Sequence, residues 1–109
     1  MTSTSSWTAI TNASNIPPRE GRAVKLGDRE VAIFHISEGD ESRFLAIDNR
    51  CPHKGGPLCD GITSGKTVVC PLHGQRFDLE TGLPVLASQP DALSTYPVRV
   101  ENGVILLQI

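Results

Sequence analysis

Two cysteines and two histidines occur at a spacing that suits metal binding. The first pair is Cys51 and His53, separated by one residue, and the second is Cys70 and His73, separated by two. Thiolate sulfur and imidazole nitrogen are the donors that zinc and iron–sulfur centres take from proteins. Proline and glycine surround both pairs, which predicts that each pair lies in a loop. These four side chains are therefore the candidate ligands.

Three interpretations of this ligand set stay open from the residues alone. Tetrahedral zinc binds two cysteines and two histidines, although zinc fingers usually separate a cysteine pair from a histidine pair. A coincidence of core cysteines and surface histidines is disfavoured, because two Cys/His pairs occur in two similar loops. The third interpretation is a [2Fe-2S] centre with two cysteines on one iron and two histidines on the other.

Short apolar runs separated by turn residues must position these loops. Strands are predicted over residues 7–10, 22–26, 29–36, 43–48 and 75–79, with Gly27-Asp28 as a hairpin turn. The run 43–48 leads directly into the first ligand pair. A further hairpin, with Ser64-Gly65-Lys66 as its turn, leads to the second. Asn102-Gly103 predicts another hairpin within residues 96–107.

No segment has a sustained helical stripe, so the predicted fold class is all-β, a sandwich or barrel of short strands. Residues 31–36 are apolar on both faces, which predicts a central strand covered on two sides. The expected core residues are apolar positions of the predicted strands: Val24, Ile33, Phe34, Leu45, Ile47, Val98, Val100 and Ile105.

Length and charge exclude several classes of protein. The 109 residues suit a single domain, 1–109, and the polar residues 1–6 are expected to be a disordered start. A net charge of -2 gives no basic excess for nucleic acid, and no apolar run reaches the ~20 residues of a membrane span. No signal peptide is visible, so we expect a cytoplasmic protein.

The three cysteines disfavour a disulfide framework and favour metal or redox chemistry. Cys59 has no histidine at ligand spacing and is expected to be a packing residue or an unpaired thiol. His35 lies within a predicted strand and is expected to be structural. Lys54, Arg50 and Arg76 flank the ligands, where charged side chains are ordinarily solvated but could form a docking rim.

The two ligand pairs, together with Pro52, Pro71 and Gly74, resemble the Rieske family. The resemblance implies an antiparallel β-sandwich with a small cluster-binding subdomain, here residues 49–76, and one [2Fe-2S] cluster per chain. It also implies that Cys51 and Cys70 hold the inner iron, whereas His53 and His73 hold the outer iron near the surface. No residue of this chain is expected to be catalytic.

The resemblance also bears on the reduction potential. Rieske centres span about -150 to +300 mV, above all-cysteine clusters, because imidazole in place of thiolate makes the centre less negative. High-potential members carry extra cysteines, a serine and a tyrosine around the cluster, whereas Gly56, Leu72, Gln75 and Phe77 stand at those places here. We therefore expect a low potential, which falls as the pH rises through the pKa values of His53 and His73.

Among small Rieske proteins, the chain most resembles the small subunit of assimilatory NAD(P)H-dependent nitrite reductase. The runs 54–58 and 77–82 carry most of this resemblance, and residues 29–34 and Trp7 add to it. It implies a partner: the large flavin, iron–sulfur and sirohaem subunit that reduces nitrite to ammonium. The alternative is a Rieske ferredoxin that serves an aromatic-ring-hydroxylating dioxygenase and its reductase. Outside this class, a structural zinc module and a regulatory binding domain without redox use remain.

Overall fold

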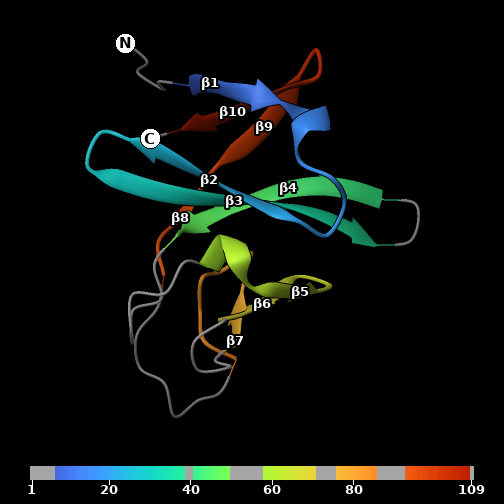
Figure 1. Ribbon diagram of the computed structural model, residues 1–109, viewed down its shortest axis with the longest axis vertical. Helices are drawn as coiled ribbons and strands as arrows, with labels where there is room; N and C mark the ends of the chain where they lie inside the picture. The colour runs from blue at the N-terminus through green and yellow to red at the C-terminus, as the bar shows by residue number, and fades with distance from the viewer. Residues whose placement is uncertain (1–6, 39–40, 50–57, 71–75, 86–92, 109) are drawn as a thin grey trace.

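The computed structural model describes residues 7–38, 41–49, 58–70, 76–85 and 93–108, which form three antiparallel sheets lying one above another (Figure 1). The terminal sheet has the order β1 (Trp7–Asn12), β10 (Val104–Gln108), β9 (Val98–Glu101). The central sheet has the order β2 (Gly21–Leu26), β3 (Arg29–Glu38), β4 (Glu41–Asp48), β8 (Thr95–Tyr96). The small sheet has the order β5 (Ile62–Ser64), β6 (Thr67–Val69), β7 (Arg76–Asp78). The all-β prediction is confirmed.

Strand β3 is the centre of the fold because both of its faces are buried. Val31, Ala32, Ile33 and Phe34 are all fully buried. Successive side chains of a strand point to opposite faces, and the two faces pack into two different cores. Burying a valine, isoleucine or phenylalanine side chain stabilises the fold by about 1.5–3 kcal/mol. The predicted central strand is therefore confirmed.

The two cores lie on either side of the central sheet. The small-sheet core joins it to the small sheet, and the terminal-sheet core joins it to the terminal sheet. The small-sheet core consists of Ala32, Phe34, Ile36, Ile47, Leu58, Val68, Cys70, Phe77, Leu79 and Leu93. The terminal-sheet core consists of Ile16, Val31, Ile33, Ala46, Ile105 and Leu107.

Tight turns join the hairpins where the sequence predicts them. Gly27, at φ 63°, turns β2 into β3. Asn102 and Gly103, at φ 52° and 77°, turn β9 into β10, and two left-handed residues match the twist of a two-residue hairpin. In the hairpin of β5 and β6, Ser64 pairs with Thr67. The turn is therefore shorter than predicted, and Ser64 belongs to the strand.

The C-terminal region differs from the prediction in two respects. Residues 96–107 do not form one hairpin, because Thr95 and Tyr96 pair with β4 in the central sheet. Pro97 follows, has no N–H for a sheet ladder, and marks the step to the terminal sheet. Val100 is not a core residue: it is 45% exposed on β9, which lies at the edge of its sheet.

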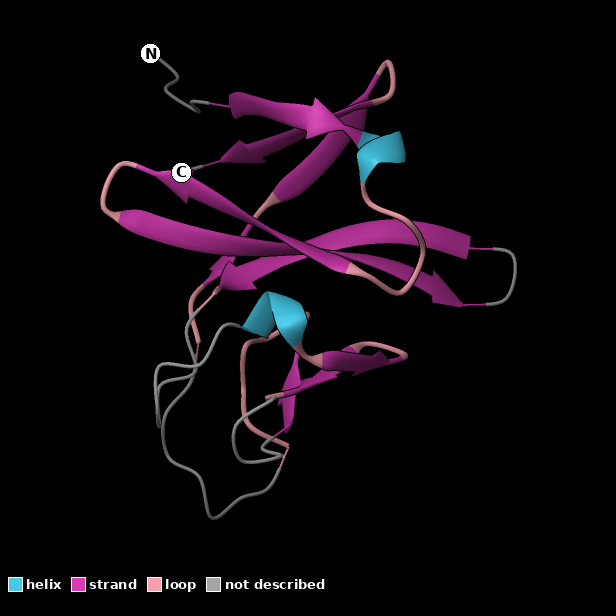
Figure 2. Ribbon diagram, viewed as in Figure 1, coloured by secondary structure: helices cyan, strands magenta, loops and turns pink. Residues whose placement is uncertain are grey.

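Short helical turns and some strand ends were not predicted. The helical residues in the described ranges are η1 (Ala13–Asn15) and η2 (Leu58–Asp60), both 3₁₀ and three residues long (Figure 2). Elements of this length are too short to show a periodic pattern. Strand β1 runs two residues beyond its predicted end. None of the described helices is long or apolar enough to cross a membrane.

Candidate metal centre

The structure describes one of the four candidate ligands, Cys70, directly after β6. The other three, Cys51, His53 and His73, lie outside the described residues, as do the flanking positions Arg50 and Lys54. The residues that border both ligand segments are described. They show how the fold brings the ends of these segments together.

Cys70 is almost fully buried, with 1% of its surface exposed. It belongs to the small-sheet core together with Leu58, Val68 and Phe77. Leu58 directly follows the first ligand segment, so the borders of both segments share one apolar cluster. The Cys70 side chain therefore faces protein rather than water.

The ends of the first ligand segment, residues 50–57, are joined by a side chain. Asn49 follows β4 and accepts, through Oδ1, a 2.7 Å hydrogen bond from the backbone N–H of Cys59 in η2. The backbone N–H of Asn49 donates to the carbonyl of Glu30 at 2.9 Å. The segment that carries Cys51 and His53 therefore leaves and rejoins the described structure at one place.

A close backbone approach joins η2 to strand β6. A Cβ on Gly61 would overlap the carbonyl oxygen of Val69 and lie 2.9 Å from Cγ2 of Val68. Only glycine allows the two backbones to come this near. Since Val69 precedes Cys70, the described residues that follow the first ligand segment lie against those that precede the second.

The ends of the second ligand segment, residues 71–75, are joined by strand pairing. Val69 on β6 pairs with Arg76 on β7, and the residues between them carry His73. Phe77 is buried and forms a bridge with Pro84. Its side chain has no hydroxyl that could donate a hydrogen bond to a cluster, as the sequence indicates. Gln75, the other predicted difference, lies outside the described residues.

The run 77–82 forms a turn built by Asp78. Its Oδ1 accepts hydrogen bonds from the backbone N–H groups of Glu80, at 2.8 Å, and Thr81, at 3.1 Å. Gly82, at φ 76°, ends the turn, and a Cβ there would overlap the carbonyl oxygen of Leu93. The strand predicted over residues 75–79 is β7, which ends at Asp78, where this turn begins. The structure shows that it folds the chain back along β7.

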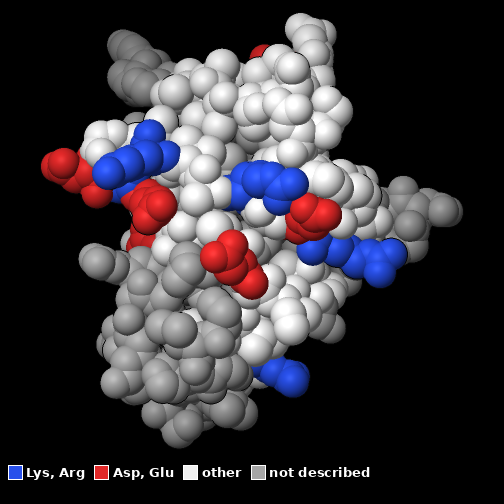
Figure 3. Space-filling model, in the orientation of Figure 1, with Lys and Arg blue, Asp and Glu red and all other residues white. Residues whose placement is uncertain are grey.

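Glu80 links the small sheet to the central sheet by two ion pairs. Its carboxylate contacts Nζ of Lys66 at 2.7 Å and Nη2 of Arg43 at 3.0 Å. The hydrogen bonds from Lys66 and Arg43 lower the pKa of the Glu80 carboxyl, and the bond to Glu80 raises the pKa of Lys66. Among the described residues on the face shown in Figure 3, acidic and basic side chains are interspersed.

Asp48, the last residue of β4, is held by the strand that pairs with it. The Tyr96 hydroxyl donates to Oδ1 of Asp48 at 2.6 Å, and the backbone N–H of Ser94 donates to Oδ2 at 3.2 Å. Burial and the bond to Asp48 raise the pKa of Tyr96. The end of β4 is thus braced just before the first ligand segment.

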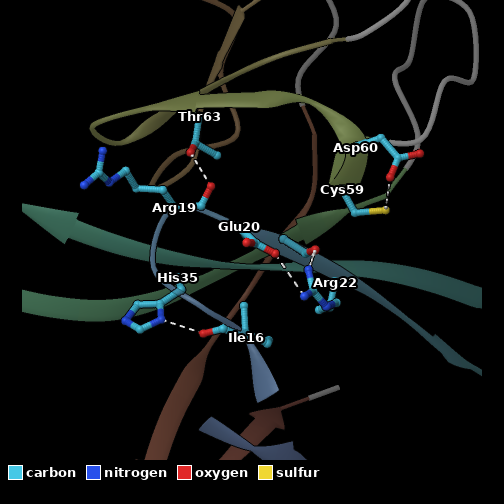
Figure 4. Close-up of polar contacts among 9 residues, drawn as sticks. Ile16, Arg19, Glu20, Arg22, His35, Cys59, Asp60 and Thr63 are labelled. Atoms are coloured by element: carbon cyan, nitrogen blue, oxygen red, sulfur yellow. Dashed lines mark hydrogen bonds and ion pairs between the residues drawn. The ribbon is translucent and has the colours of Figure 1, made fainter. Parts of the chain in front are cut away.

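His35 and Cys59 have structural surroundings. Nδ1 of His35 forms a 2.7 Å hydrogen bond with the carbonyl of Ile16 (Figure 4), and Nε2 forms one with the Ser42 hydroxyl. The His35 ring packs on the Phe44 ring, with 4.3 Å between the ring centroids. Cys59 is half-buried against the small-sheet core, and burial, followed by the charge of Asp60, raises the pKa of its thiol. Both residues are placed as the sequence predicts.

Two cysteines and two histidines are the donor set of a Rieske [2Fe-2S] centre. No group of three or more His, Cys, Asp and Glu side chains in the described ranges is arranged to hold a metal ion. The described residues that border the two ligand segments instead lie together, and Cys70 among them is buried. Sequence reasoning missed Asn49, Gly61 and Glu80, because each acts through a residue distant in the chain.

Sequence comparisons find ferredoxin components of dioxygenase systems among the relatives of this chain. It is 31% identical over 106 residues to the ferredoxin component of the naphthalene 1,2-dioxygenase/salicylate 5-hydroxylase systems of a Ralstonia species, covering 97% of this chain and 98% of that protein. It is 37% identical over 92 residues to the 3-phenylpropionate/cinnamic acid dioxygenase ferredoxin subunit of Shigella flexneri serotype 5b (strain 8401), covering 83% of each chain.

Structural comparisons find both kinds of small Rieske protein. The Sphingomonas yanoikuyae B1 ferredoxin matches with a TM-score of 0.83 and 25% identity over 95% of this chain and 99% of that one. The E. coli protein NirD matches with a TM-score of 0.80 and 32% identity, over 96% of this chain and 97% of that one. A Mycobacterium tuberculosis structure assigned to the NADH-dependent nitrite reductase small subunits matches with a TM-score of 0.81 and 26% identity, over 96% of each chain.

These comparisons agree with the fold and with the cysteine and histidine pattern. Residues 6–108 match the family described as the Rieske-like [2Fe-2S] domain, which covers nearly all of the chain. The chain therefore belongs to the Rieske-like [2Fe-2S] domain family and carries electrons on a [2Fe-2S] cluster.

Proposed function

We propose that Cys51, His53, Cys70 and His73 hold the cluster, within a cluster-binding subdomain of residues 49–76. The burial of Cys70 between the joined borders of the two ligand segments carries this proposal. Cys51 and Cys70 ligate the inner iron, and His53 and His73 ligate the outer iron on the side of the solvent. When bound, the cluster accepts and releases one electron.

The residues around the cluster influence its reduction potential. The small-sheet core excludes water from the Cys70 side, and an apolar neighbourhood disfavours the more negative, reduced cluster. Phe77 contributes no hydroxyl donor that would offset this effect. We therefore propose a potential toward the lower end of the Rieske range of about -150 to +300 mV.

Metal analysis and spectroscopy of the purified protein test the ligand assignment. We expect two irons and two acid-labile sulfides per chain and an EPR signal on reduction, all lost in Cys70→Ser. Stoichiometric zinc without sulfide would overturn the assignment. A measured potential well above about +100 mV would overturn the proposal of a low-potential centre.

We further propose that this chain is the cytoplasmic small subunit of an assimilatory NAD(P)H-dependent nitrite reductase, in which it relays electrons and the large flavin and sirohaem subunit reduces nitrite to ammonium. The runs 54–58 and 77–82 support this partner. So does the similarity to the M. tuberculosis structure, which extends over 96% of each chain. No substrate site is proposed on this chain.

A dioxygenase ferredoxin is the second candidate, because the sequence relatives named above are ferredoxin components of dioxygenase systems. Co-purification separates the two. We expect the tagged chain to capture a sirohaem-containing subunit and to increase its NAD(P)H-dependent nitrite consumption. Capture of a ring-hydroxylating oxygenase, with electron transfer to it and no effect on nitrite consumption, would favour the second candidate instead.

A further inference from the structure

Asn49 is the one buried polar side chain in the described ranges, with 3% of its surface exposed. Burying an amide costs free energy unless its polar atoms find partners. Its Oδ1 has such a partner in the backbone N–H of Cys59, at 2.7 Å. Because an N–H can only donate, the side-chain atom that faces it must be the oxygen.

The backbone of Asn49 is fixed to the central sheet. Its N–H donates to the carbonyl of Glu30 at 2.9 Å, just before β3 begins its buried run. The preceding residue, Asp48, is held by Ser94 and Tyr96 of the chain that pairs with β4. The amide therefore projects from a rigid base, and a rigid base is what accurate positioning of a site requires.

The partner of Asn49 is fixed as well. Cys59 lies in η2, whose first residue, Leu58, is fully buried in the small-sheet core. The backbone N–H of Gly61 donates to the carbonyl of Leu58 at 2.9 Å, and Gly61 lies against Val69. A hydrogen bond between Asn49 and Cys59 therefore connects the central sheet to the element that borders Cys70.

We propose that Asn49 is a positioning residue for the cluster. Its side chain joins the described residues on either side of the segment that carries Cys51 and His53. This inference rests on the ligand assignment proposed above. Without Oδ1, the part-buried N–H of Cys59 loses its acceptor, so η2 and the end of β4 are joined less firmly and the first ligand pair is positioned less accurately.

The test compares cluster release from holoproteins. Asn49→Leu keeps the volume and removes the acceptor, whereas Asn49→Asp keeps an acceptor oxygen. Thr63→Val is the matched control. Thr63 donates a 3.0 Å hydrogen bond to the carbonyl of Arg19 (Figure 4) and also joins the small sheet to the rest of the protein, but neither partner adjoins a ligand segment. Iron release to a ferrous chelator and the EPR line widths of the reduced cluster are measured for all variants.

We expect Asn49→Leu to release iron about tenfold faster than the unmodified protein, a factor that corresponds to about 1.4 kcal/mol and to the loss of one part-buried hydrogen bond. Its EPR lines should broaden as the ligand geometry becomes heterogeneous. Asn49→Asp should restore release to within about threefold of the unmodified rate, and Thr63→Val should leave release and line widths unchanged.

Two results would overturn the inference. One is an Asn49→Leu protein with unmodified release and line widths. The other is equal acceleration in Asn49→Leu and Thr63→Val, which would show a general loss of stability rather than positioning. If Asn49→Leu fails to fold, Asn49→Ser takes its place with the same expectations, because its hydroxyl is too short to reach the Cys59 N–H. Absence of iron and sulfide from the unmodified protein would instead refute the ligand assignment itself.

Discussion

Gly61 is the position at which one added methyl group should move the two halves of the metal centre apart. In Gly61→Ala the new Cβ would overlap the carbonyl oxygen of Val69 and lie 2.9 Å from Cγ2 of Val68 and 3.1 Å from the carbonyl oxygen of Leu58. Two of these three neighbours are backbone atoms, which cannot rotate away. Gly61 does not adopt a left-handed φ, so the cost of the substitution is steric rather than conformational.

The size of the effect follows from two opposing contributions. Ordinary carbon–oxygen contacts require about 3.3–3.6 Å, so η2 and β6 must separate by roughly 1 Å. Overpacking of this kind costs about 1–3 kcal/mol. Alanine also restricts the unfolded chain, which offsets about 0.4–1 kcal/mol. The expected net loss is about 1–2 kcal/mol, or a Tm lower by about 4–9 °C for a domain of this size.

Calorimetry and iron release measured on the same holoprotein provide the assay. Gly103→Ala is the control: Gly103 has a φ of 77° and nothing within 4 Å of an added Cβ, so alanine there introduces only backbone strain. It lies in the turn between β9 and β10, at the opposite end of the molecule from the small sheet (Figure 1). We expect both variants to lower the Tm and only Gly61→Ala to accelerate iron release.

Two outcomes would refute this reasoning. A Gly61→Ala protein with an unchanged or higher Tm would show that η2 and β6 can separate without cost. A lower Tm with iron release equal to that of Gly103→Ala would show that the approach of η2 to β6 does not support the metal centre.

Three further predictions concern groups around the small sheet and the end of β4. Glu80→Gln removes two exposed ion pairs and should lower the Tm slightly near neutral pH. Because the pKa of Glu80 is lowered in the folded state, the difference in Tm between the two proteins should disappear as the pH falls from 4.5 through that lowered pKa. Thermal melts across the acid range measure this difference. Tyr96→Phe removes the bond to Asp48 and should cost about 1 kcal/mol at pH 7; because the pKa of Tyr96 is raised, the difference should persist up to pH 10 and shrink as the pH rises through the raised value. Burial raises the pKa of the Cys59 thiol, so iodoacetamide should alkylate Cys59 at pH 8 more slowly than it alkylates a free thiol. Mass spectrometry follows the reaction, and faster alkylation than that of a free thiol would contradict the half-buried position.

Local patterns in the chain predicted most of the strands correctly. The hairpins at Gly27 and at Asn102-Gly103 were predictable because a two-residue turn depends mainly on the residues within it. The central position of β3 was predictable because both of its faces are apolar. Val100 and Tyr96 were assigned wrongly, because the exposure of a strand residue and its choice of sheet depend on which strands lie beside it.

The sequence by itself determined which donor groups are available to a metal centre. Two Cys/His pairs at short spacing specify soft-metal donors, and the proline, glycine and apolar runs around them specify loops between strands, because these properties depend on residues near one another in the chain. Only the tertiary structure decided how the borders of the two ligand segments meet. Asn49 bonds Cys59, Gly61 lies against Val69, and Glu80 reaches Arg43. Such contacts join residues on different elements, and they form only when the two cores pack the sheets together.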